Sequence, residues 1–202
     1  MLPQDVPPAL QVLWGAGAGP CTSGHIITGG ISCNVNALVE SRPDTGNNSW
    51  LASCVSGGSG PAHACSGANF PTVGYEQSSG TNPSTAPCTK GLVIGGGCSC
   101  TAAGILAAHA VGNAWECTCV SGTAHAYAVC AKLSQVPQAA NGTDGSTSTA
   151  TCPAGKLVGG GCSTTSGSGP IINSLPDAGS NSWSCSFGVG NKGKAHAYCA
   201  TL

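Results

Sequence analysis

The sequence predicts an all-β protein of three tandem disulfide-stapled β modules, with an extended N-terminal arm. Three observations predict this class: fourteen cysteines at repeated spacings, short β-branched runs bounded by glycines, and a composition of only 4% aromatic and 6% charged residues. A chain so poor in large apolar side chains has little material for one extensive core. Disulfides can replace core in small modules.

The cysteines fall into three sets that repeat one pattern. Each set opens on a Cys, reaches a second Cys through a Gly-rich stretch, and then passes a Trp, a third Cys and an Ala-His-Ala before its closing Cys. Even numbers of Cys at repeated spacings indicate a disulfide framework and an oxidising environment. The sets are Cys21, Cys33, Cys54 and Cys65; Cys88, Cys98, Cys100, Cys117, Cys119 and Cys130; and Cys152, Cys162, Cys185 and Cys199.

Gaps that are correlated between the repeats predict which cysteines pair. The first repeat has Ile31 and Ala52 at the positions of Cys98 and Cys117, and the third has Thr164 and Phe187 at those of Cys100 and Cys119. Partners are expected to be lost together, because a lone buried thiol is a liability in an oxidising setting. The predicted pairs are Cys98–Cys117, Cys100–Cys119, Cys33–Cys54 and Cys162–Cys185, and by elimination Cys21–Cys65, Cys88–Cys130 and Cys152–Cys199.

A second pairing fits the same spacing. If the two segments are neighbouring antiparallel strands, Cys98 lies opposite Cys119 and Cys100 lies opposite Cys117. That register makes Cys33–Cys54 a diagonal contact of about 7–8 Å, which is long for a cystine. We prefer the argument from the repeats, and at the level of sequence both pairings remain open.

The repeats also predict the organisation of the chain. The runs 24–30, 91–97 and 155–161 each place apolar residues before glycines, which predicts a buried strand that ends in a close backbone approach. Such repeats form either a string of modules or three sectors around one pseudo-threefold axis. We expect an extended docking arm over 1–20, β repeats over 21–65, 88–131 and 152–202, and linkers over 66–87 and 132–151, with extra strands near 70–75 and 133–138.

Three further patterns are candidates for chemistry. His63, His125 and His196 recur in Ala-His-Ala, but their distances to the closing Cys differ, so we do not expect a shared metal site. The Cys-X-Cys pairs are spaced too closely for an ordinary zinc site and are interpreted as cystines. The recurring tryptophans are interpreted as core beside the cystines. We predict no catalytic residues, no metal and no cofactor, and the near-neutral charge without a basic run predicts neither nucleic-acid nor membrane binding.

The N-terminal segment differs from the rest of the chain. It contains Pro3, Pro7, Pro8 and Pro20 but no cysteine, and it lacks the features of a secretory signal peptide. Proline favours an extended conformation and lowers the entropy lost on ordering. We therefore expect the segment to dock on other structural proteins of an assembly through Leu10, Val12, Leu13 and Trp14.

The third repeat carries a recognisable pattern. Its residues 152–163 read CPAGKLVGGGCS, followed by Trp183-Ser184-Cys185 and then by Ala195-His196-Ala197-Tyr198-Cys199-Ala200. This pattern resembles a Cys-rich β-repeat of bacterial extracellular proteins and of bacteriophage surface or fibre proteins, and the resemblance covers most of the chain. It implies a non-enzymatic role on an exposed surface.

Two functions follow from these expectations. The first is a structural or adhesive surface component of an extracellular assembly, most plainly a bacteriophage virion protein such as a head decoration, collar spike or fibre tip, with a host-surface glycan as a further partner. The alternative is a freestanding secreted lectin-like carbohydrate-binding protein. The expected location is the virion surface or the extracellular space.

Overall fold

The computed structural model describes residues 12–16, 20–22, 24–34, 36–55, 62–66 and 72–201, with the backbone alone for 12–16, 62–64 and 66. The described residues form seventeen strands and no helix, so the all-β prediction is confirmed. The strands are β1 (Val12–Ala16), β2 (Ile26–Ser32), β3 (Leu38–Asp44), β4 (Ser49–Cys54), β5 (Ala62–Ser66), β6 (Val73–Ser79), β7 (Ser84–Pro87), β8 (Leu92–Cys100), β9 (Ile105–Val111), β10 (Ala114–Cys119), β11 (Ala124–Ala131), β12 (Gln138–Asn141), β13 (Thr147–Thr151), β14 (Lys156–Ser166), β15 (Ile171–Asp177), β16 (Ser182–Phe187) and β17 (Lys192–Ala200).

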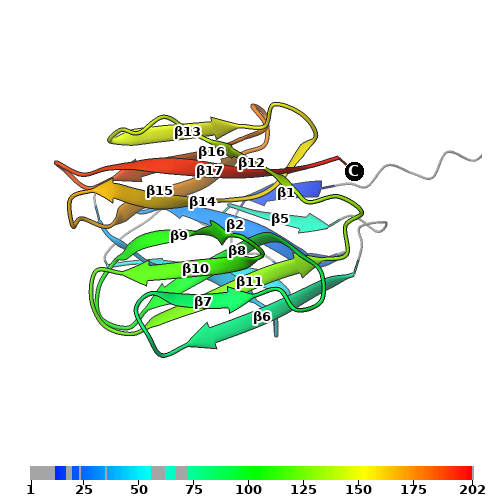
Figure 1. Cartoon of the computed structure of the whole chain (residues 1–202), viewed down its shortest axis with the longest axis horizontal. Coiled ribbons are helices and arrows are strands. Elements are labelled where there is room, and N and C mark those ends of the chain that lie inside the picture. The colour runs from blue at the N-terminus through cyan, green and yellow to red at the C-terminus, as the bar shows by residue number, and fades with distance from the viewer. Residues whose placement is uncertain are drawn as a thin grey trace, which may run out of the picture.

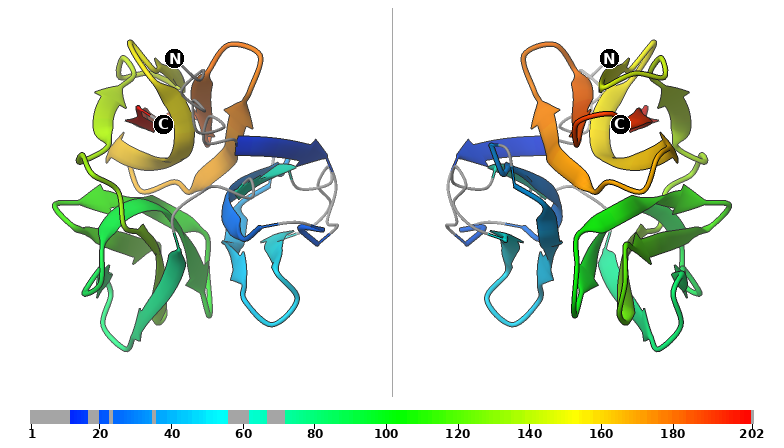
Figure 2. Two further views of the ribbon diagram at one scale, coloured as in Figure 1. Left: turned by 90° about the vertical axis from the view of Figure 1, so that its right-hand side faces the viewer. Right: turned by 90° about the vertical axis from the view of Figure 1, so that its left-hand side faces the viewer.

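The strands build three sheets (Figure 1). Sheet I has the order β1-β5-β2-β15-β16-β13, sheet II the order β12-β17-β14-β9-β10-β7, and sheet III the order β4-β3-β8-β11-β6. Neighbouring strands in every sheet are antiparallel. Figure 2 shows the first repeat in blue, the second in green and the third in yellow to red, arranged around a common centre.

Each repeat is divided between two sheets. The central hairpin of one repeat continues the sheet of the next: β3–β4 pairs with β8, β9–β10 with β14, and β15–β16 with β2. The three junctions are equivalent, because Ser41 pairs with Cys98, Ala108 with Cys162, and Ser174 with Ile31. The repeats therefore close around a pseudo-threefold axis, and they do not form a string of separate modules.

The two segments expected to be linkers contain paired strands. Strands β6 and β7 lie within 66–87, and β12 and β13 lie within 132–151. β6 and β12 occupy equivalent positions, because each pairs with the last strand of a repeat, β11 or β17. β7 and β13 pair in the same equivalent way with β10 and β16. These segments complete the sheets.

The consecutive glycines after each apolar run explain how the sheets approach one another. A Cβ on Gly95 would lie only 2.7 Å from the carbonyl oxygen of Ile27, so the central strands of different repeats meet there. A Cβ on Gly96 would overlap the indole of Trp115, and one on Gly97 would overlap the backbone of Ser41. The three glycines therefore make three different close contacts. Gly95 approaches the central strand of a neighbouring repeat, Gly96 a buried Trp, and Gly97 the hairpin of the adjoining repeat.

The core consists of a large cluster that contains Trp115 and Trp183 and a small one in which Trp50 packs with Cys21, Ile26 and Cys65. Trp50, Trp115 and Trp183 are each only 1% exposed, in agreement with their interpretation as core. A cavity of about 10 Å³ between the sheets is lined by two of them, Trp115 and Trp183, together with the glycines and junction residues. A space of this size is close to that of one water molecule and excludes a ligand on the axis.

Candidate functional site

All fourteen cysteines are joined in disulfides. The pairs are those favoured by the correlated gaps between the repeats. The physical reason is that the central hairpin of each repeat lies in a different sheet from the other strands of that repeat. In the second repeat, β8 lies in sheet III whereas β10 lies in sheet II. The two segments are not neighbouring strands, so the antiparallel register that would have joined Cys98 to Cys119 does not occur. The bonds are Cys21–Cys65, Cys33–Cys54, Cys88–Cys130, Cys98–Cys117, Cys100–Cys119, Cys152–Cys199 and Cys162–Cys185.

The inner disulfides connect different sheets. Cys98 and Cys100 end β8 of sheet III, and their partners belong to β10 of sheet II. The four sulfur atoms lie within 4.8 Å of one another. Because all four are oxidised, no thiolate is left to bind zinc, and the cluster is a pair of staples across the edge between two sheets.

The structure describes only part of the predicted docking segment. Leu10 lies outside the described residues. Val12, Leu13 and Trp14 belong to β1, whose backbone pairs antiparallel with β5 of sheet I. The end of the expected arm is therefore an edge strand of the body.

The recurring histidines do not converge on one point. His125 lies in β11 of sheet III and His196 in β17 of sheet II, while the side chain of His63 lies outside the described residues. His196 instead meets His109 of the second repeat, with the two ring centroids 4.7 Å apart and the rings stacked. Gly161 pairs with His196 and lies between the strands of both histidines, so no side chain separates the rings.

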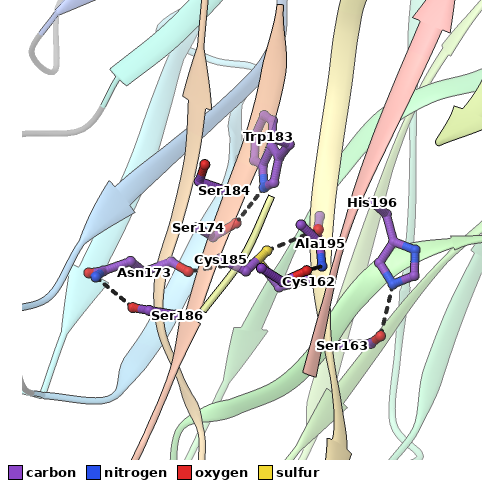
Figure 3. Close-up of a disulfide and its surroundings, with 12 residues drawn as sticks. Cys162, Ser163, Asn173, Ser174, Trp183, Ser184, Cys185, Ser186, Ala195 and His196 are labelled. Carbon is purple, nitrogen blue, oxygen red and sulfur yellow. Dashed lines mark hydrogen bonds between the residues drawn. A yellow bond between two sulfur atoms is a disulfide. The ribbon is translucent and has the colours of Figure 1, made fainter. Parts of the chain in front are cut away.

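The His196 imidazole is held at both nitrogens. Ser163 Oγ lies 2.8 Å from Nε2, and Asn141 Oδ1 lies 2.7 Å from Nδ1 (Figure 3 draws the bond to Ser163). An amide oxygen accepts, so Nδ1 carries the proton and Ser163 donates to Nε2. Burial, followed by the charges of His109 and Lys194, lowers the pKa of His196 to about 4. The ring is neutral at pH 7.

This Ser-His-Asn arrangement has the spacing of a nucleophile, a base and a group that orients the base. However, acyl transfer also needs donors directed at the developing oxyanion. Ser163 pairs with Lys194 on one side and with Ala107 on the other, so its backbone belongs to the sheet ladder. We interpret the cluster as a hydrogen-bonded network that joins the second and third repeats.

The equivalent position in sheet III carries a different pair. Gly97 pairs with Tyr127, and Arg42 lies on its other side, next to the Ser41–Cys98 pair. The Arg42 guanidinium carbon lies 5.2 Å from the centre of the Tyr127 ring. Each pair combines two repeats, Arg42 with Tyr127 and His109 with His196. Both clusters therefore arise because the central hairpin of one repeat continues the sheet of the next.

One of two pockets adjoins these clusters, because Arg42 and Tyr127 line a pocket on sheet III whereas neither His109 nor His196 lines the pocket on sheet II. The pocket on sheet III has a volume of about 190 Å³ and is lined by charged, amide and phenol side chains from β3, β6 and β11. The pocket on sheet II has about 390 Å³ and a mainly apolar lining that includes Leu92, Val136, Pro137 and Tyr198. The two pockets therefore differ both in their place on the fold and in their chemistry.

One set of residues was missed by the reasoning from sequence. Asn48, Asn113 and Asn181 each accept a backbone N–H bond at 2.8–2.9 Å from the start of the strand after the first Cys of the repeat. Their amides donate back to carbonyls of the same loop. The signal was available, because each Asn stands two residues before the recurring Trp.

The chain matches no known protein-family model, and no curated protein is significantly similar to it.

Proposed function

We propose that this protein is a non-enzymatic structural or adhesive surface component of an extracellular assembly, a bacteriophage virion in the first instance. The observation that carries the proposal is the placement of the disulfides. Inner bonds such as Cys98–Cys117 and Cys162–Cys185 cross from one sheet to the next within every repeat. Such bonds hold the three sheets together where no cellular machinery can refold the protein.

The chemistry of the chain supports an exposed location. Seven disulfides fit an extracellular or otherwise oxidising environment. The described residues include no helix long and apolar enough to cross a membrane. The resemblance of the third repeat to Cys-rich repeats of bacterial extracellular proteins and of phage surface or fibre proteins points the same way.

We propose that attachment to the assembly involves the N-terminal segment. Leu10, Val12, Leu13 and Trp14 supply apolar side chains, and β1 anchors the segment to sheet I through its pairing with β5. An extended segment beside an edge strand presents unpaired backbone groups that a partner strand can use.

Imaging and truncation test this proposal. Immunogold electron microscopy with an antibody to the chain is expected to label extracellular particles from the source culture. Particles assembled with a chain that lacks residues 1–16, and with them Leu10, Val12, Leu13 and Trp14, should lose the label, while the truncated protein keeps its disulfides. Label confined to the cell interior would contradict the surface role, and full occupancy by the truncated chain would move the docking surface to the repeats.

One observation favours the alternative, a freestanding secreted lectin-like protein. The pocket on sheet III combines a tyrosine with charged and amide groups, which is the chemistry that binds sugars. A secreted lectin would appear as free protein in the culture medium, so the same imaging experiment separates it from a particle component.

A further inference from the structure

The pocket on sheet III is lined by three strands of that sheet. The end of β3 of the first repeat contributes to it, together with the middle of β6 and of β11 of the second, and β8 separates β3 from β11 in the sheet. Its volume of about 190 Å³ suits one monosaccharide ring better than a larger cofactor. Its lining includes Arg42, Asp44, Thr45, Glu76, Gln77 and Tyr127.

The Tyr127 ring forms the aromatic side of the pocket and contacts the Arg42 guanidinium. Arg42 stacks on Tyr127 at 5.2 Å from the ring centre, and its Nε donates to Glu40 Oε1 at 2.7 Å. A second guanidinium nitrogen donates to the carbonyl of Pro43 at 3.4 Å. The stack fixes the plane of Tyr127, and the ring stays half-exposed. An aromatic ring held in one orientation is a low-entropy surface for the C–H face of a sugar.

The hydrogen-bonding groups are also held before any ligand arrives. Asp44 accepts from the Asn47 side chain at 2.6 Å and from the Gly46 amide at 3.2 Å, and the bond from the Asn47 side chain is the main cause that keeps the pKa of Asp44 below its ordinary value. The Asp44 carboxylate keeps further lone pairs for a ligand.

The charges of the pocket select the ligand. Asp44 is negative, and the nearby Arg42 is already paired with Glu40. An acidic sugar would meet repulsion from Asp44, whereas sugar hydroxyls can donate to this carboxylate and accept from the exposed Gln77 amide, which lies on the same face of the sheet as Tyr127. We propose that this pocket binds a neutral hexopyranose ring of a surface glycan, with Tyr127 as the stacking wall and with Asp44 and Gln77 as hydrogen-bonding partners. The inference deepens the adhesive function proposed above and rests on it.

The pocket on sheet II has a different lining. Charged side chains are absent from its lining, and Tyr198 is turned inward, with its hydroxyl accepting from the Ala110 amide at 2.5 Å. The phenol of Tyr198 is buried, unlike that of Tyr127.

A glycan array and calorimetry test the proposal on the whole oxidised chain. The probes are an array of neutral, acidic and amino-sugar glycans, followed by titration with the neutral glycan that gives the strongest signal. Tyr127→Ala is expected to weaken binding by about tenfold or more, and Gln77→Ala by a smaller factor. The matched control is His109→Ala, which removes a side chain from the equivalent row of sheet II and should leave the affinity unchanged.

Each result decides the matter. Peptide mapping of the disulfides first shows that each variant is folded, and Tyr127→Phe, which keeps the ring, should retain most of the affinity. An array without neutral-glycan binding, binding limited to acidic glycans, or a Tyr127→Ala variant with full affinity would overturn the site. Particle labelling in the imaging experiment is independent of these results, so failure of the sugar site is distinguishable from failure of the surface role.

Discussion

The indole nitrogen of Trp183 donates a hydrogen bond to the hydroxyl of Ser174 at 3.1 Å, in the buried space between the sheets (Figure 3). The first repeat has the same bond, from the Trp50 indole nitrogen to the Ser41 hydroxyl at 2.9 Å. In the second repeat the equivalent residue is Ala108, and the Trp115 indole nitrogen is buried without a partner among the described residues. An unpaired buried N–H costs stability comparable to a lost hydrogen bond.

Restoring the missing hydroxyl should stabilise the protein. Ala108→Ser is expected to raise the free energy of unfolding by about 0.5–1.5 kcal/mol, because it supplies the acceptor that the other two repeats have. Ser174→Ala should lower it by about 1–3 kcal/mol, because it leaves the Trp183 N–H unpaired. Guanidinium denaturation measures both. The gain should vanish in a Trp115→Phe background, and a gain that persists there would show that the hydroxyl acts on something other than the indole.

The glycine beneath a tryptophan should not tolerate a methyl group. A Cβ on Gly160 would overlap the Trp183 indole, which is buried and cannot move aside. Gly160→Ala is therefore expected to lower the free energy of unfolding by about 1–3 kcal/mol. Gly74→Ala is the control, since nothing lies within 4 Å of its added Cβ. Equal effects of the two substitutions would contradict the packing role given to the second glycine of the motif.

The extent to which sequence predicted this structure depends on how local each feature is. The pairing of Cys98 with Cys117 was predictable, because gains and losses of cysteine are visible along the chain. The contribution of β9 to the sheet of the third repeat was not, because three similar repeats give similar strands and the sequence does not say which copy a hairpin joins. The all-β class was predictable from the local β propensity of the short strands alone.

The candidate site was not predictable for the same reason. Arg42 and Tyr127 are 85 positions apart in the sequence, and they meet only because β3 crosses into the sheet of the second repeat. The stacked pair of His109 and His196 arises in the same way. The hydrogen bonds made by Asn48, Asn113 and Asn181 could have been predicted from the sequence. Each Asn stands two residues before the recurring Trp, so the pattern is visible when the three repeats are aligned.

The second repeat has two adjacent inner disulfides, Cys98–Cys117 and Cys100–Cys119, so each of them should be partly redundant for stability. Replacing Cys98 and Cys117 by Ala leaves the adjacent Cys100–Cys119 bond, which closes a loop of the same sequence separation, 19 residues. Replacing Cys162 and Cys185, whose separation is 23, removes the only inner bond of the third repeat. We expect the second change to cost about 3 kcal/mol on the chain-entropy model and the first distinctly less.

The comparison is matched in burial, because all four sulfur-bearing residues are at most 3% exposed. Cavity costs therefore nearly cancel, and the difference reports the constraint on the unfolded chain. Chemical denaturation of both double variants measures it, and strong reductant should lower the thermal midpoint of the parent protein further than either variant. Equal losses for the two variants would mean that the neighbouring bonds do not share one constraint.

The last prediction concerns the pH dependence of stability at His196. Its pKa in the folded state is about 4, chiefly through burial and secondarily through His109 and Lys194, whereas the ordinary value is 6.5. As the pH falls below 6.5 the unfolded chain binds a proton at this residue that the folded chain does not. The stability contributed by neutral His196 is therefore complete above pH 6.5 and is lost as the pH falls towards 4. Glu116 pairs with His109 on the neighbouring strand. His196→Gln keeps a side chain able to hydrogen-bond with Ser163 or Asn141 but removes the titration, so the difference in unfolding free energy between parent and variant should shrink steadily from pH 7 to pH 4.5. Carboxylates that titrate in the same range cancel in that difference. An NMR titration of the His196 ring supplies the direct check, and a midpoint near 6.5 would show that the ring is open to water and that the hydrogen bonds to Ser163 and Asn141 do not hold it neutral.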